Sequence, residues 1–150
     1  MSDNWIIIIP QDPEFVPSKQ AQESAILFFQ ELAPSADEIK VKLSDRIRFI
    51  DCGSNLDRIV CPDCAGELEL EWWQDSMDEE YEKGFPLRPL SLPCCGSQRT
   101  LQELAYDWPQ GFARFSLEAM NPSIPDLEEQ DLNRFSSILG CKVLKILQHI

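Results

Sequence analysis

Residues 112–120 read FARFSLEAM, a stretch in which apolar and polar side chains alternate. A period of two residues is typical of a β-strand that buries one face and exposes the other. Pro109 and Gly111 predict a turn before this strand, and the NPSIP sequence at 121–125 ends it. The face expected to be buried comprises Ala113, Phe115, Leu117 and Ala119.

The chain beyond this strand predicts a helix and a last strand. Leu132, Phe135 and Leu139 have the spacing of one helical face, and Gly140 suits the position after the helix end. The final stretch, KVLKILQHI at 142–150, is rich in the branched aliphatic residues of a central strand.

The N-terminal part predicts the same order of elements. Trp5–Ile9 is a short apolar run ended by Pro10, as in a buried strand. Ser18 is a plausible N-cap for the helix that follows, and Pro34 stops that helix.

The next stretch, EIKVKL at 38–43, alternates aliphatic residues with lysines and so predicts another strand. A two-residue turn at 44–45 would place the arginines of RIRFI, at 46–50, on the apolar face, which is the wrong register. Two alternatives keep the apolar side intact, namely a three-residue loop or one long bulged strand.

The order strand, helix, strand therefore occurs twice, which predicts the α+β class. It is the order of a ferredoxin-like split βαβ sandwich, in which two helices pack on one antiparallel sheet. The alternative is a looser α+β fold in which strands of an insert extend the sheet. We expect one domain, 1–150, with a zinc-ribbon-like insert at 52–105. The expected helices lie near 18–33 and 126–139, and the expected strands near 5–9, 39–43, 113–120 and 142–149.

Two cysteine pairs lie in that insert, in CPDC at 61–64 and PCCG at 93–96. The C-x2-C spacing lets both sulfurs of the first pair point at one centre. A strand in GELELEWW, at 66–73, and a second in LRPLSLP, at 87–93, would form the hairpin of a zinc ribbon. We expect one structural Zn²⁺ per chain, held by Cys61, Cys64, Cys94 and Cys95.

The adjacent Cys94 and Cys95 depart from the second C-x2-C of a standard ribbon. Adjacent side chains diverge, so both can bind the metal only if the backbone turns sharply, which Gly96 would help. Otherwise Cys52 or His149 would supply the fourth ligand. Free or transiently oxidised thiols, another metal, a disulfide and a redox C-x2-C are the competing interpretations. A redox motif opens a helix, however, whereas a strand is expected here.

The insert is too small to bury much apolar surface, so bound metal should supply much of its folding free energy. Arg88 and Arg99 flank the second cysteine pair, and we expect them to donate hydrogen bonds to its sulfurs. The remaining elements have a core of their own.

The chain has 26 acidic and 13 basic residues, a formal net charge of −13 at pH 7. Such a surface repels phosphate backbones, so we expect no nucleic-acid binding. Eight carboxylates and no basic residue lie between Glu67 and Glu82, whereas four basic residues gather at 40–48. The acidic stretch either keeps the protein soluble or attracts a basic partner protein, and both can hold.

The start, MSDNWIIIIPQDP, has no basic leader followed by a long apolar stretch, and no run approaches the roughly 18 apolar residues of a membrane span. We therefore expect a cytoplasmic protein that does not bind membranes. No G-x-G-x-x-G or G-x4-G-K-[ST] phosphate loop is present, and the one histidine is His149, so we expect no catalytic residues.

The combination of CPDC, WWQD, LPCCG and DWPQGFARF resembles a family of uncharacterised bacterial proteins of similar length. Its members carry the two cysteine pairs and a DWPxGFARF-like stretch, and some have automatic names suggesting sugar-transporter ATPases. The resemblance implies that the cysteine pairs belong together. It does not imply an ATPase, because the nucleotide loop is missing.

Two functions fit these observations. The first is a non-enzymatic, acidic protein-binding module with a structural zinc site, for example an immunity protein that neutralises a toxin. The second is an enzyme or small-molecule-binding protein with a cleft between sheet and insert. That cleft would be lined by Trp73, Asp107, Trp108 and Arg114.

Overall fold

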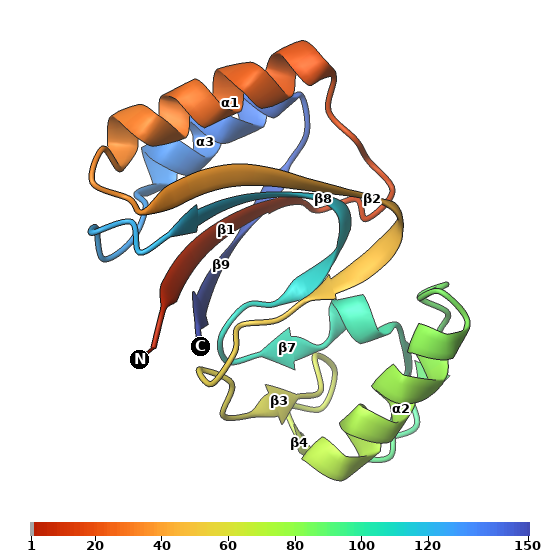
Figure 1. Cartoon of the computed structure of the whole chain (residues 1–150). Helices are drawn as coiled ribbons and strands as arrows, with labels where there is room; N and C mark the ends of the chain where they lie inside the picture. The colour runs from red at the N-terminus through yellow and green to blue at the C-terminus, as the bar shows by residue number, and fades with distance from the viewer. Residues whose placement is uncertain (1) are drawn as a thin grey trace. The chain divides into compact units, whose positions relative to one another are not determined.

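The computed structural model describes residues 2–150, which form two compact units (Figure 1). Within the described residues, unit 1 comprises 2–55 and 109–150, and unit 2 comprises 56–108. Unit 2 covers most of the segment predicted as an insert, whereas Cys52 belongs to unit 1. Within residues 2–150, no helix has both the length and the apolar composition that crossing a bilayer requires.

Unit 1 is a four-stranded sheet with two helices. Its strand order is β2-β8-β1-β9, and each neighbouring pair is antiparallel. The mixed α+β class is therefore confirmed. The elements of unit 1 are β1 (Asn4–Pro10), α1 (Lys19–Leu32), β2 (Glu38–Ile50), β8 (Gly111–Met120), α3 (Glu129–Leu139) and β9 (Val143–His149).

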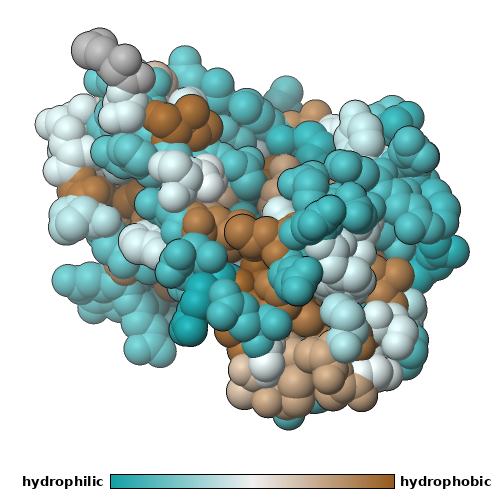
Figure 2. Space-filling model, turned by 90° about the horizontal axis from the view of Figure 1, so that it is seen from below, coloured by the Kyte–Doolittle hydropathy of each residue, from teal (hydrophilic) through white to brown (hydrophobic). Residues whose placement is uncertain are grey.

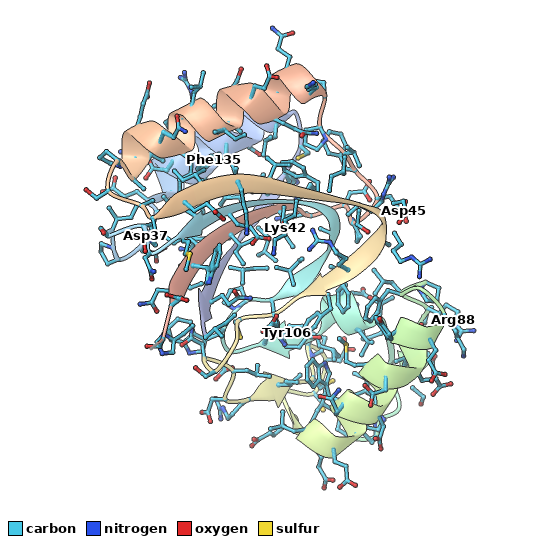
Figure 3. All side chains as sticks on the ribbon, viewed as in Figure 1. Asp37, Lys42, Asp45, Arg88, Tyr106 and Phe135 are labelled. Atoms are coloured by element: carbon cyan, nitrogen blue, oxygen red, sulfur yellow. The ribbon has the colours of Figure 1, made fainter. Side chains whose placement is uncertain are left out.

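Both helices of unit 1 lie on the same face of the sheet (Figure 1). The alternation along β8 is the reason, because Phe115, Leu117 and Ala119 project from one face and pack in the core with residues of α1 and α3. Phe135 of α3 lies between its helix and the sheet, whereas Lys42 lies on the helix-free side (Figure 3). The polar residues of β8 project to that second face.

Local signals set the start of α1 and the end of α3 as expected, whereas α3 begins at Glu129 and not near 126. The Ser18 hydroxyl accepts a hydrogen bond from the backbone N–H of Ala21 at 3.1 Å, which satisfies one of the free donors at the start of α1. Gly140 follows α3 with a φ of 78°, a conformation that glycine adopts without steric cost.

Strand β2 is one long bulged strand, the second of the two alternatives left open by its sequence. Leu43 lies opposite Phe115, and Arg48 lies opposite Ala113, so the four residues 44–47 face a single residue of β8. Ile39 and Val41, before the bulge, pack against the core, and the bulge shifts the register of the residues that follow it.

Unit 2 consists of short strands and one long helix. Its strands form two small sheets, β4-β3-β7 and β5-β6, so they do not extend the sheet of unit 1. The alternative fold with an extended sheet is therefore wrong. The elements are β3 (Ile59–Val60), β4 (Glu67–Leu68), α2 (Leu70–Glu82), β5 (Leu90–Ser91), β6 (Gln98–Arg99), a 3₁₀ turn (Leu101–Glu103) and β7 (Ala105–Tyr106).

The predicted strand through GELELEWW is wrong beyond Leu68, because helix α2 begins at Leu70. Trp73, Met77 and Glu80 fall at i, i+4 and i+7 and are buried along one face of this helix. A helical pattern thus replaces the alternation after two residues. As a result, a helix separates the two cysteine pairs, in place of the single hairpin expected from the sequence.

The core of unit 1 yields the first prediction. Phe135 is fully buried and makes edge-on ring contacts with Phe28 and Phe29, at centroid distances of 4.9 and 5.2 Å. Phe135→Ala should lower the free energy of unfolding by about 3–5 kcal/mol in urea titrations, because it leaves a cavity between the helices and the sheet. Leu27→Ala, at a side chain 62 % exposed, should change it by about 0.5 kcal/mol or less. Equal effects of the two substitutions would contradict this description of the core.

Candidate metal centre

The four cysteines of unit 2 converge on one point. The sulfurs of Cys61, Cys64, Cys94 and Cys95 all lie within 4.8 Å of one another, and this group can hold a metal ion. The Cys61 and Cys95 sulfurs are 3.8 Å apart, and those of Cys94 and Cys95 are 3.9 Å apart. A tetrahedral ion with metal–sulfur bonds of about 2.3 Å needs sulfurs about 3.8 Å apart. The closest spacings therefore suit a four-coordinate thiolate site.

Two backbone turns present these sulfurs. In the first cysteine turn, residues 61–66, the N–H of Cys61 donates to the carbonyl of Gly66 at 2.8 Å. The N–H of Ala65 donates back to the carbonyl of Cys61 at 3.1 Å. A short antiparallel pair, β3 and β4, flanks this turn and fixes its ends.

The second cysteine turn, residues 92–97, has the same hydrogen bonds. The N–H of Leu92 donates to the carbonyl of Ser97 at 2.9 Å, and the N–H of Gly96 donates to the carbonyl of Leu92 at 2.8 Å. The pair β5 and β6 flanks it as β3 and β4 flank the first turn. Leu92 therefore stands at the position of Cys61, and Cys95 stands at the position of Cys64.

This equivalence explains how adjacent cysteines both face the centre. The second turn has a buried leucine, Leu92, where the first has a cysteine, and its extra thiol, Cys94, comes from the third position of the turn. The position after each last cysteine has a positive φ, 62° at Ala65 and 76° at Gly96. The sharp turn that the sequence requires at Gly96 is present, and glycine adopts it readily.

Backbone N–H groups point at the sulfurs of the first turn. Cys61 Sγ accepts from the N–H of Cys64 at 3.5 Å and of Asp63 at 3.4 Å, and Cys64 Sγ accepts from Gly66 at 3.3 Å. The bond from the Cys64 N–H is the main reason that the pKa of Cys61 falls to about 6. This cysteine is thus prepared to bind a cation as a thiolate.

The two thiols of the second turn have pKa values shifted in opposite directions. Hydrogen bonding of Cys95 Sγ with the side chain and with the backbone of Ser97 lowers the pKa of Cys95. Partial removal from water raises the pKa of Cys94 to about 12, and hydrogen bonds to the sulfurs of Cys64 and Cys61 act in the same direction. A bound cation stabilises thiolates, so metal binding would favour deprotonation of Cys94 despite its raised pKa.

An ion pair also links the two turns. Arg99, in β6, donates from Nε and Nη2 to the two carboxylate oxygens of Asp63 at 2.8 and 2.6 Å. Its Nη1 donates to Glu103 at 3.2 Å, and the guanidinium lowers the pKa of Asp63. Arg88 lies 3.7 Å from the buried carboxylate of Glu80. The expected hydrogen bonds from Arg88 and Arg99 to sulfur are therefore wrong, because both arginines pair with carboxylates.

The other candidate ligands lie in unit 1 and outside the sulfur group. The Cys52 thiol is buried and donates to Oε1 of Gln110 at 3.4 Å. Nδ1 of His149 lies 2.6 Å from Oδ1 of Asn4. The structure therefore groups the four cysteines of the two turns without Cys52 or His149.

The residues proposed to line a ligand cleft have local roles. Trp73 is buried in unit 2 and donates from its indole N–H to the hydroxyl of Tyr106 at 3.1 Å. The Asp107 carboxylate accepts the backbone N–H groups of Asp57 and Trp108, which shapes a loop. In unit 1, Arg114 Nε donates to the carbonyl of Ser44 in the bulge at 3.1 Å.

Comparisons with models of protein families, with curated proteins and with solved structures gave no match. The site is therefore interpreted from its own geometry. The equivalence of the two turns was the feature that sequence reasoning missed. A signal for it exists, because Pro62 and Pro93 occupy the same position, one residue after the start of each turn.

The second prediction tests which cysteines bind metal. Cys94→Ser and Cys95→Ser should each lower the metal bound per purified chain at least about tenfold at limiting free metal, because serine is a poor ligand for soft ions. Cys141→Ser, a cysteine outside the group, is the matched control and should leave the metal content unchanged. Elemental analysis after gel filtration gives the stoichiometry. Loss of metal in Cys52→Ala or His149→Gln, with retention in Cys94→Ser, would show that the ligand set is different.

Proposed function

We propose that this protein is a non-enzymatic binding module in which a structural Zn²⁺ folds unit 2, and helix α2 of that unit receives a basic protein partner. The observation that carries the proposal is the convergence of four thiols within 4.8 Å. Four sulfur donors with tetrahedral spacing are typical of structural zinc. Four thiolates also leave no open coordination position, so the ion has a structural role.

The finer description of the fold belongs to this proposal. Unit 1 is a ferredoxin-like split βαβ sandwich. Its antiparallel strand order, β2-β8-β1-β9, and the two helices on one face support that assignment. Unit 2 is a zinc-ribbon-like module with a helix inserted between its two cysteine turns. The identical hydrogen bonds of those turns support it.

Apart from a small apolar core, unit 2 has only short strands to link its two cysteine turns. Its strands are two residues long, and its sheets have three and two strands. Isolated pairs of such strands are only marginally stable in water. The metal and the Arg99–Asp63 ion pair therefore supply the cross-link between the turns.

The partner is a basic protein surface. Glu80 of α2 is buried, but the remaining carboxylates of the segment 67–82 are exposed. They create a negative potential that accelerates the approach of a positive partner and weakens as salt increases. A toxin neutralised by an immunity protein is a concrete partner of this kind. The carboxylates are Glu67, Glu69, Glu71, Asp75, Asp78, Glu79 and Glu82.

We also propose that the chain belongs to the bacterial family that it resembles. The motifs CPDC, LPCCG and DWPQGFARF support this, since they supply both cysteine turns and the start of the central strand β8. The automatic ATPase names of some members find no support in these residues.

The third prediction concerns loss of metal. Chelation should increase amide hydrogen exchange throughout residues 56–108 and leave β1, β8 and β9 protected, because those strands belong to the separate core of unit 1. Hydrogen exchange read by mass spectrometry, with and without chelator, measures this directly. Re-addition of Zn²⁺ should restore protection. Equal loosening of both units would contradict the structural role of the metal in unit 2.

The fourth prediction concerns the partner. Immobilised protein should retain a basic protein from a lysate of its own cells at low salt, and a fourfold neutralised α2 variant should retain at least about tenfold less. The control carries as many neutralisations on exposed carboxylates of unit 1 and should retain as much as the parent. The α2 variant is E71Q/D75N/D78N/E82Q, and the control is E14Q/E23Q/E31Q/E129Q.

Quantitative mass spectrometry of the retained proteins compares the parent and the two variants at low and high salt. Capture that survives high salt, or that both variants reduce equally, would contradict binding through α2. Zinc content of the same preparations separates loss of the partner surface from loss of the fold.

A further inference from the structure

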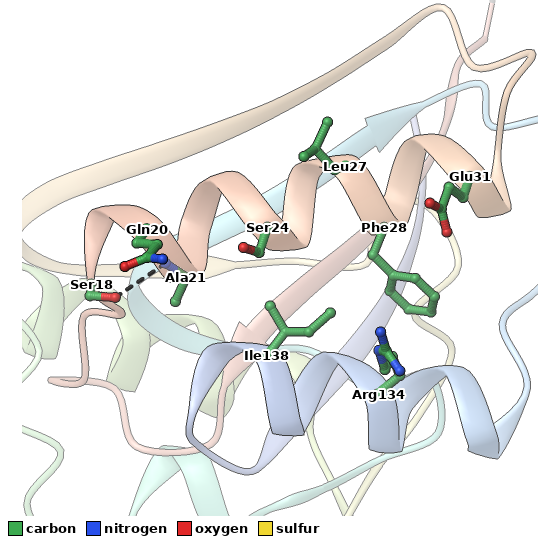
Figure 4. Close-up of a pocket in the computed structure, with 9 residues that line it drawn as sticks. All are labelled: Ser18, Gln20, Ala21, Ser24, Leu27, Phe28, Glu31, Arg134 and Ile138. Atoms are coloured by element: carbon green, nitrogen blue, oxygen red, sulfur yellow. Dashed lines mark hydrogen bonds between the residues drawn. The ribbon is translucent and has the colours of Figure 1, made fainter.

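Unit 1 contains two hollows, one between its helices and one on its sheet. One is an open groove of about 530 Å³ between α1 and α3, where Arg134 lies over the ring of Phe28 (Figure 4). The other is a pocket of about 230 Å³ lined from all four strands. Its walls include Trp5, Ile7 and Phe49. Ile7 alternates with Ile6 and Ile8, which pack against the helices, so this pocket lies on the helix-free face.

A chain of polar side chains runs along that face. Ser116 is fully buried, and its hydroxyl donates to Oε2 of Glu118 at 2.7 Å. Because the only O–H of Ser116 is used in this hydrogen bond, its oxygen acts as an acceptor for Nη2 of Arg48 at 3.1 Å. Glu118 is itself 5 % exposed, and Lys42 lies 3.5 Å from its Oε1. The network therefore fixes the guanidinium of Arg48 at the pocket wall.

Arg48 has no counter-ion of its own. Among residues 2–150, no carboxylate lies within ion-pair distance of it, although the chain has twice as many acidic as basic residues. Its one hydrogen bond goes to a neutral hydroxyl, which leaves most of the five guanidinium N–H donors unused. This half-buried guanidinium therefore has donors available for an anion that enters the pocket.

The carboxylates of the pocket already have partners. Glu118 is engaged by Lys42 and Ser116. Oδ2 of Asp51 accepts the backbone N–H of Gly53 at 2.9 Å, which closes a local turn. Arg48 is therefore the pocket residue with several unused hydrogen-bond donors.

We propose that this pocket binds a small organic carboxylate. The guanidinium of Arg48 receives the carboxylate in the planar, two-bond geometry that arginine favours. The apolar part of the ligand lies against Trp5, Ile7 and Phe49. The volume corresponds to about eight waters, enough for a ligand of about ten heavy atoms. This site is independent of the metal centre and of the acidic helix.

Sodium phenylacetate is a suitable probe, because it combines one carboxylate with one ring. Titrated into the ¹⁵N-labelled zinc-bound chain, it should shift backbone amide signals of β1, β2, β8 and β9 near the pocket and leave α1 and α3 unchanged. Phenylacetamide has the same shape without the charge and should bind at least about tenfold more weakly, the effect expected for loss of a charge-assisted hydrogen bond.

Two variants test the role of Arg48. Arg48→Gln should weaken phenylacetate binding at least about tenfold, whereas Arg46→Gln, which removes an equal charge from an exposed position in the bulge, should not. Ile150→Glu adds a negative charge at an exposed residue of the pocket rim and should weaken binding without disturbing the core. A folded spectrum of Ile150→Glu keeps the test valid if Arg48→Gln is unstable.

Three results would overturn the proposal. The first is an absence of shifts localised to the pocket up to 20-fold excess over about 1 mM protein. The second is equal affinity for phenylacetate and phenylacetamide, and the third is equal weakening by Arg48→Gln and Arg46→Gln. None of them bears on the zinc site or on the partner of α2.

Discussion

The two faces of strand β8 need two different environments, and the architecture of unit 1 follows from that requirement. The strand lies between β1 and β2 in the sheet, so neither of its edges is open. Phe115 and Leu117 must be removed from water on one face, and α1 and α3 cover them there. Ser116 and Glu118 project to the other face, where burial is tolerated only because each has a hydrogen-bond or ion-pair partner. The pocket on that face is thus a consequence of the same alternation.

Unit 2 has a smaller apolar core than unit 1, with Ile59, Leu92 and Leu101 among its buried side chains. Trp73 and Tyr106 make one edge-on ring contact, and the tyrosine hydroxyl donates to the carbonyl of Leu101 at 2.7 Å. These contacts hold α2 to the small sheet. The two cysteine turns depend on side-chain links instead, and four mutually close thiols with an ion pair between the turns suit a metal cross-link. The acidic helix α2 therefore belongs to the unit that the proposed metal would cross-link.

Charge is distributed unevenly through the protein. Hydrophilic residues cover most of the face seen in Figure 2, with hydrophobic residues gathered in patches between them. Among residues 2–150, Lys83 is the cation that pairs with an exposed carboxylate of α2, Glu79. Strand β2, in contrast, carries four of the thirteen basic residues of the chain. Opposite charges thus mark different surfaces, and the proposals for a basic protein partner and for a small carboxylate rest on different residues.

The sequence alone determined those features that depend on neighbours along the chain. Alternation in FARFSLEAM specified the faces of β8, Ser18 specified the start of α1, and Gly140 specified the end of α3, because each acts through periodicity or a local hydrogen bond. The two cysteine pairs also identified the candidate ligands. By contrast, the start of α2 at Leu70 was not predicted from the sequence.

Only the tertiary structure decided how distant segments combine. The residues after Leu68 contain both an alternating pattern, through Leu70 and Trp72, and a helical one. The burial of Trp73 and Met77 shows that the helical pattern is the one used. Likewise, Cys94 reaches the other sulfurs because two turns that are distant in the sequence share one set of hydrogen bonds. Arg48 lies at the pocket because it follows the bulge in β2 and because it donates to the hydroxyl of Ser116, 68 residues away in the sequence. Such features depend on contacts between segments far apart in the chain, which local periodicity does not encode.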